Sequence, residues 1–292
     1  MSTEFTTLDG QLDATDVHRV ISTALEEDLR YGPDVTTAAC VPASAVATAT
    51  VSPRVGGTLA GLPVFLAVLD EVLGAGGYEV LAHRRDGECL ACGEVALAVR
   101  APVAGLLTAE RTALNLLCHL SGVATTTAAW VSAVAGTGAL IRDSRKTLPG
   151  LRALQKYAVR CGGGVNHRMG LGDAMLIKDN HVAVAGSVTA AIAAVRARAP
   201  ALPCEVEVGT LEELEEALAA GVSLVLLDNM TVEQCAQAVR RAAGTGTELE
   251  VSGGLRLDQA RAYAETGVRY LAVGALTHSA PALDFGLDLS TP

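Results

Sequence analysis

The chain has 292 residues, half of which are apolar, and its formal net charge is −10 at pH 7. This length is enough for two domains or for one large barrel. The acidic balance argues against general binding to nucleic acids or to anionic membranes, because no long basic stripe occurs outside residues 141–181. Only 3% of the residues are aromatic, so we expect a core built from Ala, Val and Leu.

The N-terminus and the cysteines indicate a cytoplasmic protein. The first ten residues (MSTEFTTLDG) contain neither the basic nor the apolar region of a secretion signal. An uncharged run, residues 123–141, is broken by polar residues and glycines, which favours an amphipathic helix and a strand over a membrane span. Seven cysteines, an odd number, imply reduced thiols. Cys89 and Cys92 form the only CxxC pair, and further zinc ligands are not evident nearby.

The first third of the chain predicts a small α/β sandwich domain. Helical spacing of apolar residues indicates a helix over residues 16–30, capped by Thr15 or Asp16. The other expected elements are a helix at 61–74 and strands at 46–51, 78–82, 94–100 and 105–107. Thr108 is expected to cap a further helix, which would place Arg111 in its first turn, where the helix dipole disfavours a cation. This unfavourable position hints at an anionic partner for Arg111.

From residue 139 the pattern changes to alternating strands and helices, the βα repeat of a barrel or a doubly wound sheet. Thr210 with Glu213, and Thr231 with Gln234, resemble the capping boxes that begin helices. Short apolar strands are expected at residues 139–142, 174–177, 204–208, 224–227, 249–251 and 270–273.

Polar residues stand at or just beyond the end of one expected strand after another. They are Arg145, Lys146, Lys178, Glu207, Asp228, Ser252 and Gly274. In (β/α) barrels the functional residues gather at the carboxyl ends of the strands, so this recurrence favours a barrel. Since six strands are clear, we predict an irregular, incomplete (β/α) barrel over residues 114–279. The smaller N-terminal α/β sandwich domain would span residues 1–113, and the C-terminal tail, 280–292, would pack on it.

Residues 141–181 concentrate cations in this acidic chain. Arg152, Lys156 and Arg160 have i, i+4 spacing and are expected along a solvated helix face. The other cations lie among glycines and a proline, where turns bring the backbone close to a ligand. These are Arg145, Lys146, His167, Arg168 and Lys178. Since Arg and Lys bind carboxylates and phosphates, we expect a ligand with several anionic groups.

Ten motifs, in order, resemble the quinolinate phosphoribosyltransferase family, the carboxylating nicotinate-nucleotide diphosphorylases among the type II phosphoribosyltransferases. They are EDLRYGPDVTT, ERTALNLLCHLSGVAT, DSRKTLPGLR, KYAV, GGGVNHR, LIKDNH, EVEV, LLDN, SGG and GALTHS. Ser144 stands where the family more often has Thr, and it keeps the hydroxyl. The resemblance implies transfer of phosphoribosyl from phosphoribosyl pyrophosphate to quinolinate with decarboxylation. The products would be nicotinate mononucleotide, carbon dioxide and pyrophosphate, in de novo NAD biosynthesis.

The resemblance also implies roles for the cations. Those expected to hold the quinolinate carboxylates, near Ser144, are Arg145, His167, Arg168 and Lys178. Arg111 would join them from the neighbouring subunit of a homodimer, or of a higher oligomer. Lys146 would face the pyrophosphate, and Lys146 and Lys178 are candidate catalytic residues.

The remaining requirements concern the sugar and its phosphate. Glu207 and Asp228 are candidate catalytic residues that could stabilise positive charge on the ribose or bind Mg²⁺, directly or through the Mg²⁺-pyrophosphate complex. The expected 5′-phosphate cradle is Ser252, Gly253, Gly254, Gly274 and Ala275. We expect no tightly bound organic cofactor, and we interpret Asn180 and His181 as structural.

Three other interpretations stay open at this point. The same fold could use nicotinate, or could belong to relatives associated with molybdenum uptake. Lys178 could instead form a Schiff base in an aldolase-like barrel. A non-catalytic anion-binding module is the third possibility, but it leaves Glu207 and Asp228 without a role.

Overall fold

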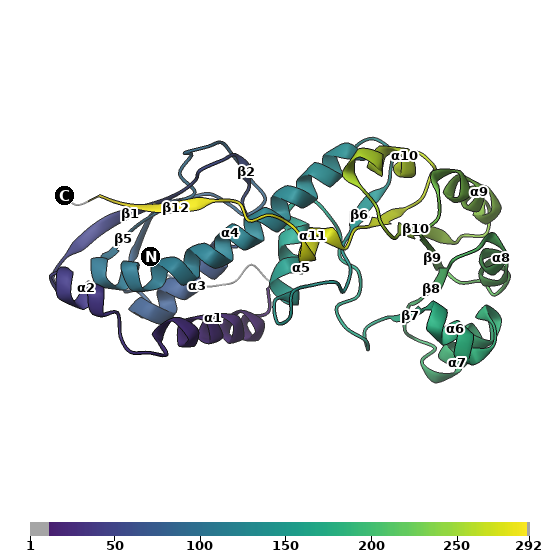
Figure 1. The fold of residues 1–292 in the computed structure, drawn as a ribbon, viewed down its shortest axis with the longest axis horizontal. Helices are drawn as coiled ribbons and strands as arrows, with labels where there is room; N and C mark the ends of the chain where they lie inside the picture. The colour runs from purple at the N-terminus through teal and green to yellow at the C-terminus, as the bar shows by residue number, and fades with distance from the viewer. Residues whose placement is uncertain (1–11, 291–292) are drawn as a thin grey trace. The chain divides into compact units, whose positions relative to one another are not determined.

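The computed structural model describes residues 12–290. Two predictions fall on residues outside this range. They are the lack of a secretion signal in the first ten residues, and the outer ends of the predicted domains. Contacts group the chain into two compact units, shown in Figure 1: Met1–Ala128 with Thr147–Gly163 and Leu276–Pro292, and Ala129–Lys146 with Gly164–Ala275. The boundary predicted at residue 113 falls inside helix α4 (Val103–Ala133), and the predicted domain ranges stay predictions.

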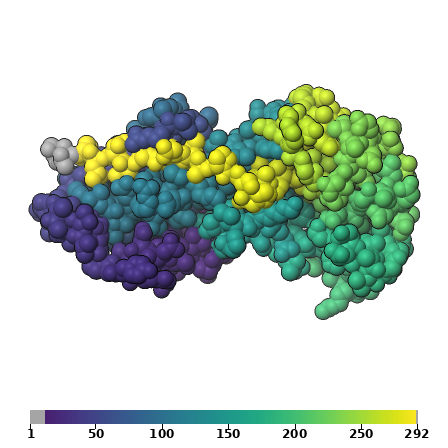
Figure 2. All heavy atoms as spheres, in the orientation of Figure 1, coloured from purple at the N-terminus to yellow at the C-terminus, as the bar shows by residue number. Residues whose placement is uncertain are grey.

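The first unit contains a four-stranded antiparallel sheet in the order β12-β1-β5-β3. Its strands are β1 (Val46–Pro53), β3 (Glu79–His83), β5 (Leu97–Pro102) and β12 (Phe285–Ser290). A short pair, β2 (Gly57–Thr58) and β4 (Cys89–Leu90), accompanies it. The chain's end returns to its beginning, because β12 pairs with β1 from Thr48–Ser290 to Pro53–Phe285. Figure 2 shows this returning segment, in yellow, at the surface of the unit.

Helices cover this sheet. They include α1 (Ala14–Leu29), α2 (Val35–Cys40), α3 (Leu62–Leu73) and the first part of α4, while α5 (Arg152–Cys161) contacts α1. The predicted cap of α1 was wrong, since Asp13 Oδ1 accepts a hydrogen bond from the Thr15 N–H at 2.7 Å. Asp86 holds the start of α3 by accepting from the N–H groups of Gly61 and Leu62 at 2.7 and 3.1 Å. No helix among residues 12–290 has the length and apolar content needed to cross a bilayer.

Helix α4 corrects two sequence predictions. The strand expected at 105–107 is helical, and Thr108 is not a cap, because α4 begins at Val103 and the Thr108 hydroxyl donates to the Ala104 carbonyl at 3.0 Å. Gly105 allows a tight contact, since a Cβ there would lie 2.1 Å from the Leu73 side chain. Close packing therefore outweighs the low helix propensity of glycine. Arg111 lies well inside the helix, so the argument from the helix dipole does not apply to it.

Helix α5 corrects a further sequence prediction. The i, i+4 cations were expected on a solvated face, but Lys156 is fully buried and Arg152 and Arg160 are partly buried. Leu154 and Ala158 on the same helix are also buried. A spacing rule places side chains on a common face of a helix but does not say what that face contacts.

The second unit is built on a six-stranded parallel sheet in the order β6-β11-β10-β9-β8-β7. The strands are β6 (Leu140–Arg142), β7 (Met175–Ile177), β8 (Cys204–Val208), β9 (Leu224–Asp228), β10 (Glu248–Ser252) and β11 (Tyr270–Ala272). These six strands match the six predicted from the sequence. β6 and β7 form the two edges, and in the described part of the chain they do not pair with each other. The irregular, incomplete barrel is therefore confirmed.

Helices connect these strands. They are α6 (Asp179–Ala185), α7 (Val188–Arg198), α8 (Leu211–Ala219), α9 (Val232–Ala242), the 3₁₀ turn η1 (Leu257–Gln259), α10 (Ala260–Ala264) and, after β11, the short α11 (Ala275–His278). Figure 1 shows α8, α9 and α10 on the outer side of the curved sheet. Both predicted capping boxes are present, at Thr210 with Glu213 and at Thr231 with Gln234. They fix where α8 and α9 begin, and hence the loops that leave β8 and β9.

Gly122 on α4 provides a test of packing in the first unit. A Cβ at this position would lie 2.1 Å from the Pro281 carbonyl oxygen, which belongs to backbone and cannot rotate away. Gly122→Ala should therefore lower the free energy of unfolding by about 2 kcal/mol, although alanine favours helix. Urea denaturation followed by circular dichroism measures the change. Gly172→Ala, where a Cβ meets open space, is the control. A variant at Gly122 as stable as wild type would contradict the contact.

Candidate active site

The parallel sheet brings the predicted rim residues of the second unit to one edge. Asp228 and Ser252 are the last residues of β9 and β10, and they pair in register. Glu207 lies next to the end of β8, and Lys178 directly follows β7. Parallel strands place their carboxyl ends on the same side, so residues far apart in the chain meet there.

A cavity of about 350 Å³ lies at this edge, on the side of β8 and β9. It is lined by Asp179, Val182, Ala183, Glu207, Gly209, Thr210, Glu213 and Asp228. Glu207 and Asp228 therefore share one cavity. Glu213 Oε2 already accepts from the Gly209 and Thr210 N–H groups at 2.7 and 3.2 Å. The other carboxylates offer the oxygen ligands that Mg²⁺ prefers, so the residues present fit that ion.

Asp179 in this cavity was not among the predicted site residues. It follows Lys178 directly in the LIKDNH motif, so its place after a strand was a usable signal. Lys178 itself forms an ion pair with Glu207 through its ammonium group. Its main-chain N–H donates to His181 Nδ1 at 2.9 Å, which gives His181 a structural role at the start of α6.

Arg145 and Arg168 together form a cationic cluster. The Nε atom of each is buried and has no hydrogen-bond partner among the described residues. Burial lowers the pKa of Arg168, and the positive charge of Arg145 lowers it further. Two neighbouring guanidinium groups with unused donors constitute a site for an anion, because a carboxylate would both satisfy the donors and relieve the repulsion.

Hydrogen bonds hold the loop that carries His167 and Arg168 against β6. Val165 pairs with Arg142 as a one-residue extension of the sheet, and its N–H donates to the Ile141 carbonyl at 2.8 Å. The fully buried Asp143 accepts from the His167 N–H at 2.8 Å and from Asn166 Nδ2 at 2.5 Å. The backbone of the GGGVNHR segment is therefore held in place by contacts within the protein, without the help of a ligand.

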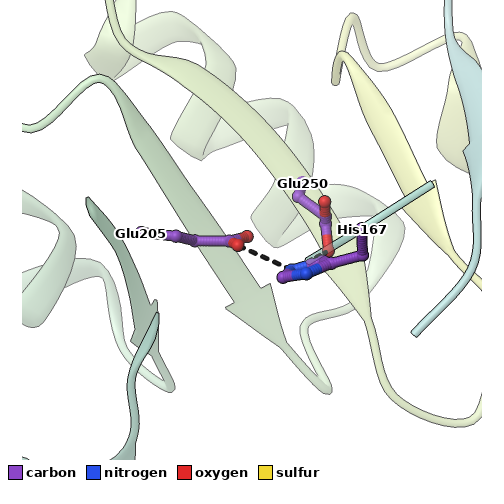
Figure 3. Close-up of side chains that lie close together, drawn as sticks. All are labelled: His167, Glu205 and Glu250. Carbon is purple, nitrogen blue, oxygen red and sulfur yellow. Dashed lines mark ion pairs between the residues drawn. The ribbon is translucent and has the colours of Figure 1, made fainter. Parts of the chain in front are cut away.

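His167 points into the sheet's interior, where Figure 3 shows Glu205 and Glu250 directed at its ring. Its Nε2 lies 2.7 Å from Glu205 Oε2 and 3.8 Å from Glu250 Oε1, and its side chain is 8% exposed. Arg142 completes the group, with Nη1 2.6 Å from Glu250 Oε2. Burial, and the negative charge of Glu205, raise the pKa of Glu250 to about 8, although Arg142 opposes the shift.

Sequence reasoning missed this interior group. Side chains alternate between the two faces of a strand, so Glu205 faces the same side as Glu207, and Glu250 the same side as Ser252. The alternation in CEVEV and ELEVS therefore carried the signal. It was not used because charged residues are seldom expected inside a barrel.

The Ser252-Gly253-Gly254 turn has a structural reason for its glycines. Both have positive φ, 95° and 60°, and a Cβ on Gly253 would lie 2.3 Å from Asn229 Oδ1. Asn229, itself at φ 54°, donates its N–H to the Ser252 carbonyl at 2.9 Å. The turn thus packs against the residue that follows Asp228. Its predicted phosphate contacts, with those of Gly274 and Ala275 after β11, stay predictions.

The other predicted site residues have defined positions without tested roles. Ser144 Oγ accepts from the Lys146 N–H at 3.0 Å, which shapes the turn after β6. Arg111 is exposed on α4 in the first unit. Its contribution to a neighbouring subunit stays a prediction.

Two family models match almost the whole chain. They are "Quinolinate phosphoribosyl transferase, N-terminal domain", over residues 34–121, and "Quinolinate phosphoribosyl transferase, C-terminal domain", over residues 123–288. The chain is 62% identical over 271 residues to the nicotinate-nucleotide pyrophosphorylase (carboxylating) of Mycobacterium leprae, covering 92% of this chain and 95% of that protein.

Solved structures give the same result. The crystal structure of NadC from Streptococcus pyogenes has a TM-score of 0.91 and 40% identity, and the match covers 96% of this chain and 99% of that one. The nicotinate-nucleotide pyrophosphorylase from Francisella tularensis has a TM-score of 0.91 and 35% identity, with 96% and 98% covered.

The raised pKa of Glu250 predicts how the free energy of unfolding depends on pH. Its pKa of about 8 in the folded chain exceeds the ordinary 4.5, so the folded state holds the extra proton between these values. Wild-type stability should therefore fall as pH rises through that window. Glu250→Gln has no proton to lose, so it should be more stable than wild type at about pH 9 and closer to it at about pH 5. Urea unfolding at both pH values measures this.

The matched control is Glu248→Gln on the same strand, whose carboxylate is 52% exposed. It should follow the wild-type pH dependence. If Glu250→Gln also followed it, the buried carboxyl would not be the group that binds the proton.

Proposed function

The chain belongs to the quinolinate phosphoribosyl transferase family, and on that premise we propose that it transfers phosphoribosyl from phosphoribosyl pyrophosphate to quinolinate with decarboxylation. The products are nicotinate mononucleotide, carbon dioxide and pyrophosphate, as in de novo NAD synthesis. The observation that carries this proposal is the pair of buried, unpartnered Nε donors on Arg145 and Arg168. They are suited to a rigid ligand with more than one carboxylate.

Arg145 and Arg168 orient the diacid. A planar guanidinium binds a carboxylate with two parallel N–H donors, which fixes direction as well as charge. The Arg168 guanidinium is already oriented, because its Nη1 donates to the Ala174 carbonyl at 3.0 Å while its Nε stays unused. A monocarboxylate such as nicotinate would leave one of the two guanidinium groups without a carboxylate partner, which favours the diacid.

Glu207 and Asp228 act on the sugar side. Positive charge develops on the ribose as pyrophosphate leaves, and fixed carboxylates near the anomeric carbon stabilise it. Asp179, Glu207 and Asp228 would hold Mg²⁺, which supplies neutralising charge for the pyrophosphate. Lys178 keeps its ammonium in an ion pair with Glu207, between the acidic cavity and the diacid. This engagement disfavours the Schiff-base alternative, which requires a free amine.

The remaining assignments follow the family. Lys146 faces the pyrophosphate, and the turns at Ser252-Gly253-Gly254 and Gly274-Ala275 receive the 5′-phosphate. Decarboxylation needs no organic cofactor, since the positively charged ribosylated ring nitrogen stabilises the carbanion. We also propose a homodimer in which Arg111 completes the partner's site. The cytoplasmic location stays a prediction.

Product release tests the substrate assignment. Purified protein with Mg²⁺, phosphoribosyl pyrophosphate and quinolinate should release carbon dioxide and pyrophosphate in equal amounts. The kcat/KM should be higher for quinolinate than for nicotinate, because only the diacid occupies both guanidinium groups. A coupled pyrophosphate assay with each acid measures the ratio. Preference for nicotinate would overturn the assignment.

Hybrid dimers test the shared site. Arg111→Ala and Lys146→Ala should each abolish activity, because each removes a cation from every site. If Arg111 serves the neighbouring subunit, a hybrid of the two variants has one site with both defects and one intact site. Mixing equal amounts after mild dissociation makes about half of the dimers hybrids, each with one intact site, so the activity of the mixture should recover toward about a quarter of wild type. No recovery, with hybrids present by mass spectrometry, would place Arg111 in its own chain's site.

A further inference from the structure

Both ring nitrogens of His167 are engaged inside the protein. Nδ1 accepts a hydrogen bond from the Arg168 N–H at 2.7 Å, and Nε2 lies 2.7 Å from Glu205 Oε2. A ring nitrogen that accepts a hydrogen bond carries no proton, so the ring proton lies on Nε2. It therefore faces the Glu205 carboxylate, which selects this tautomer and fixes the plane of the ring.

The contacts of His167 form a continuous path from the sheet interior to the anion pocket. Glu205 holds the ring, the ring holds the main chain of Arg168, and the guanidinium of Arg168 has the unused Nε donor. Glu205 also interacts with Arg168 through its charge, opposing the effect of Arg145 on the Arg168 pKa. Glu205, two residues before Glu207 on β8, is thus connected through His167 to the main chain of Arg168.

Burying these two carboxyl groups costs free energy. Glu205 and Glu250 are buried, and Oε1 of each has no hydrogen-bond partner within residues 12–290. Barrel interiors are ordinarily filled by Val, Ile and Leu, and Leu226 fills the neighbouring position on β9 here. Replacing buried charges with apolar residues of similar volume is often neutral or stabilising. Stability alone therefore does not account for Glu205.

A metal ion is a poor occupant for this group. The ligand atoms of His167, Glu205 and Glu250 lie within 4.8 Å of one another, which resembles a metal site. However, Arg142 Nη1 already contacts Glu250 Oε2 at 2.6 Å, and His167 Nε2, as the protonated nitrogen, cannot ligate a metal. Arg142 is therefore the partner of Glu250, and His167 is the partner of Glu205.

We propose that Glu205 is a positioning residue for the diacid pocket, acting through the imidazole of His167 on the main chain of Arg168. The role is distinct from substrate contact, and it assigns both ring nitrogens of His167 to contacts inside the protein, in place of the carboxylate contact implied by the family. The inference rests on the proposed function, because the pocket that it positions is the proposed quinolinate site.

Two separate substitutions of Glu205, each by a residue of similar size, test the role. Glu205→Leu removes the acceptor, so it should raise the Kd for quinolinate about tenfold or more, since small displacements of a positioning group are costly. The KM for phosphoribosyl pyrophosphate should stay within about twofold. The unfolding free energy should fall, because the buried His167 Nε2–H loses its acceptor. Glu205→Gln keeps a carbonyl acceptor for the Nε2–H and should recover most of the affinity. Isothermal titration calorimetry, steady-state kinetics and urea unfolding provide the measurements.

The control is Glu248→Leu on β10, whose half-exposed carboxylate contacts Arg269 and which should leave quinolinate binding unchanged. Wild-type affinity in Glu205→Leu would overturn the inference. So would equal losses of affinity for quinolinate and for phosphoribosyl pyrophosphate, which indicate a structural role. A divalent ion bound to wild type and absent from Glu205→Leu, by elemental analysis, would replace the inference with a metal site. If wild type itself fails to bind quinolinate, the proposed function fails as well, which is a separate result.

Discussion

The second unit depends on the parallel register of its six strands. Register fixes which side chains reach the carboxyl edge, as in the pairing of Ser252 with Asp228. Alternation then fixes what lies beneath, because the residue two positions earlier faces the same side. The rim residues Glu207 and Ser252 therefore sit above Glu205 and Glu250. One constraint produces both a charged rim open to ligands and a charged layer closed to solvent, and neither can shift by one residue without exchanging its face.

Charge pairing within these layers decides which groups can bind a ligand. Lys178 is paired with Glu207, Arg142 with Glu250, and His167 with Glu205. Arg145 and Arg168 instead keep buried Nε donors without a partner in the described chain. In a protein with a net charge of −10, the anion site thus arises from which cations the carboxylates leave unpaired. The number of cations in the central segment is a weaker guide, since several of them serve the fold.

The sequence predicted the second unit better than the first because its signals are local. Each βα repeat carries its own apolar strand and its own cap, as at Thr210, so errors do not accumulate. Gly105 was taken for a strand residue because its helical placement depends on contact with Leu73, which is distant in the chain. Lys156 was misplaced for the same reason, since burial is a property of the surroundings. The Glu205 and Glu250 layer needed the register of β8 and β10, which no single segment contains.

The unpaired guanidinium groups and the buried carboxylates are two parts of one energetic compromise. Desolvated donors bind an anion without reorganising, but before it arrives they repel each other, as the lowered pKa of Arg168 reflects. The negative charges of Asp173 and Glu205 offset that repulsion. Burying carboxylates in this layer is in turn costly, as the pKa of Glu250 shows, which is raised by its burial and by the charge of Glu205. Buried carboxylates thus stabilise neighbouring cations without occupying their Nε donors, which apolar side chains could not do.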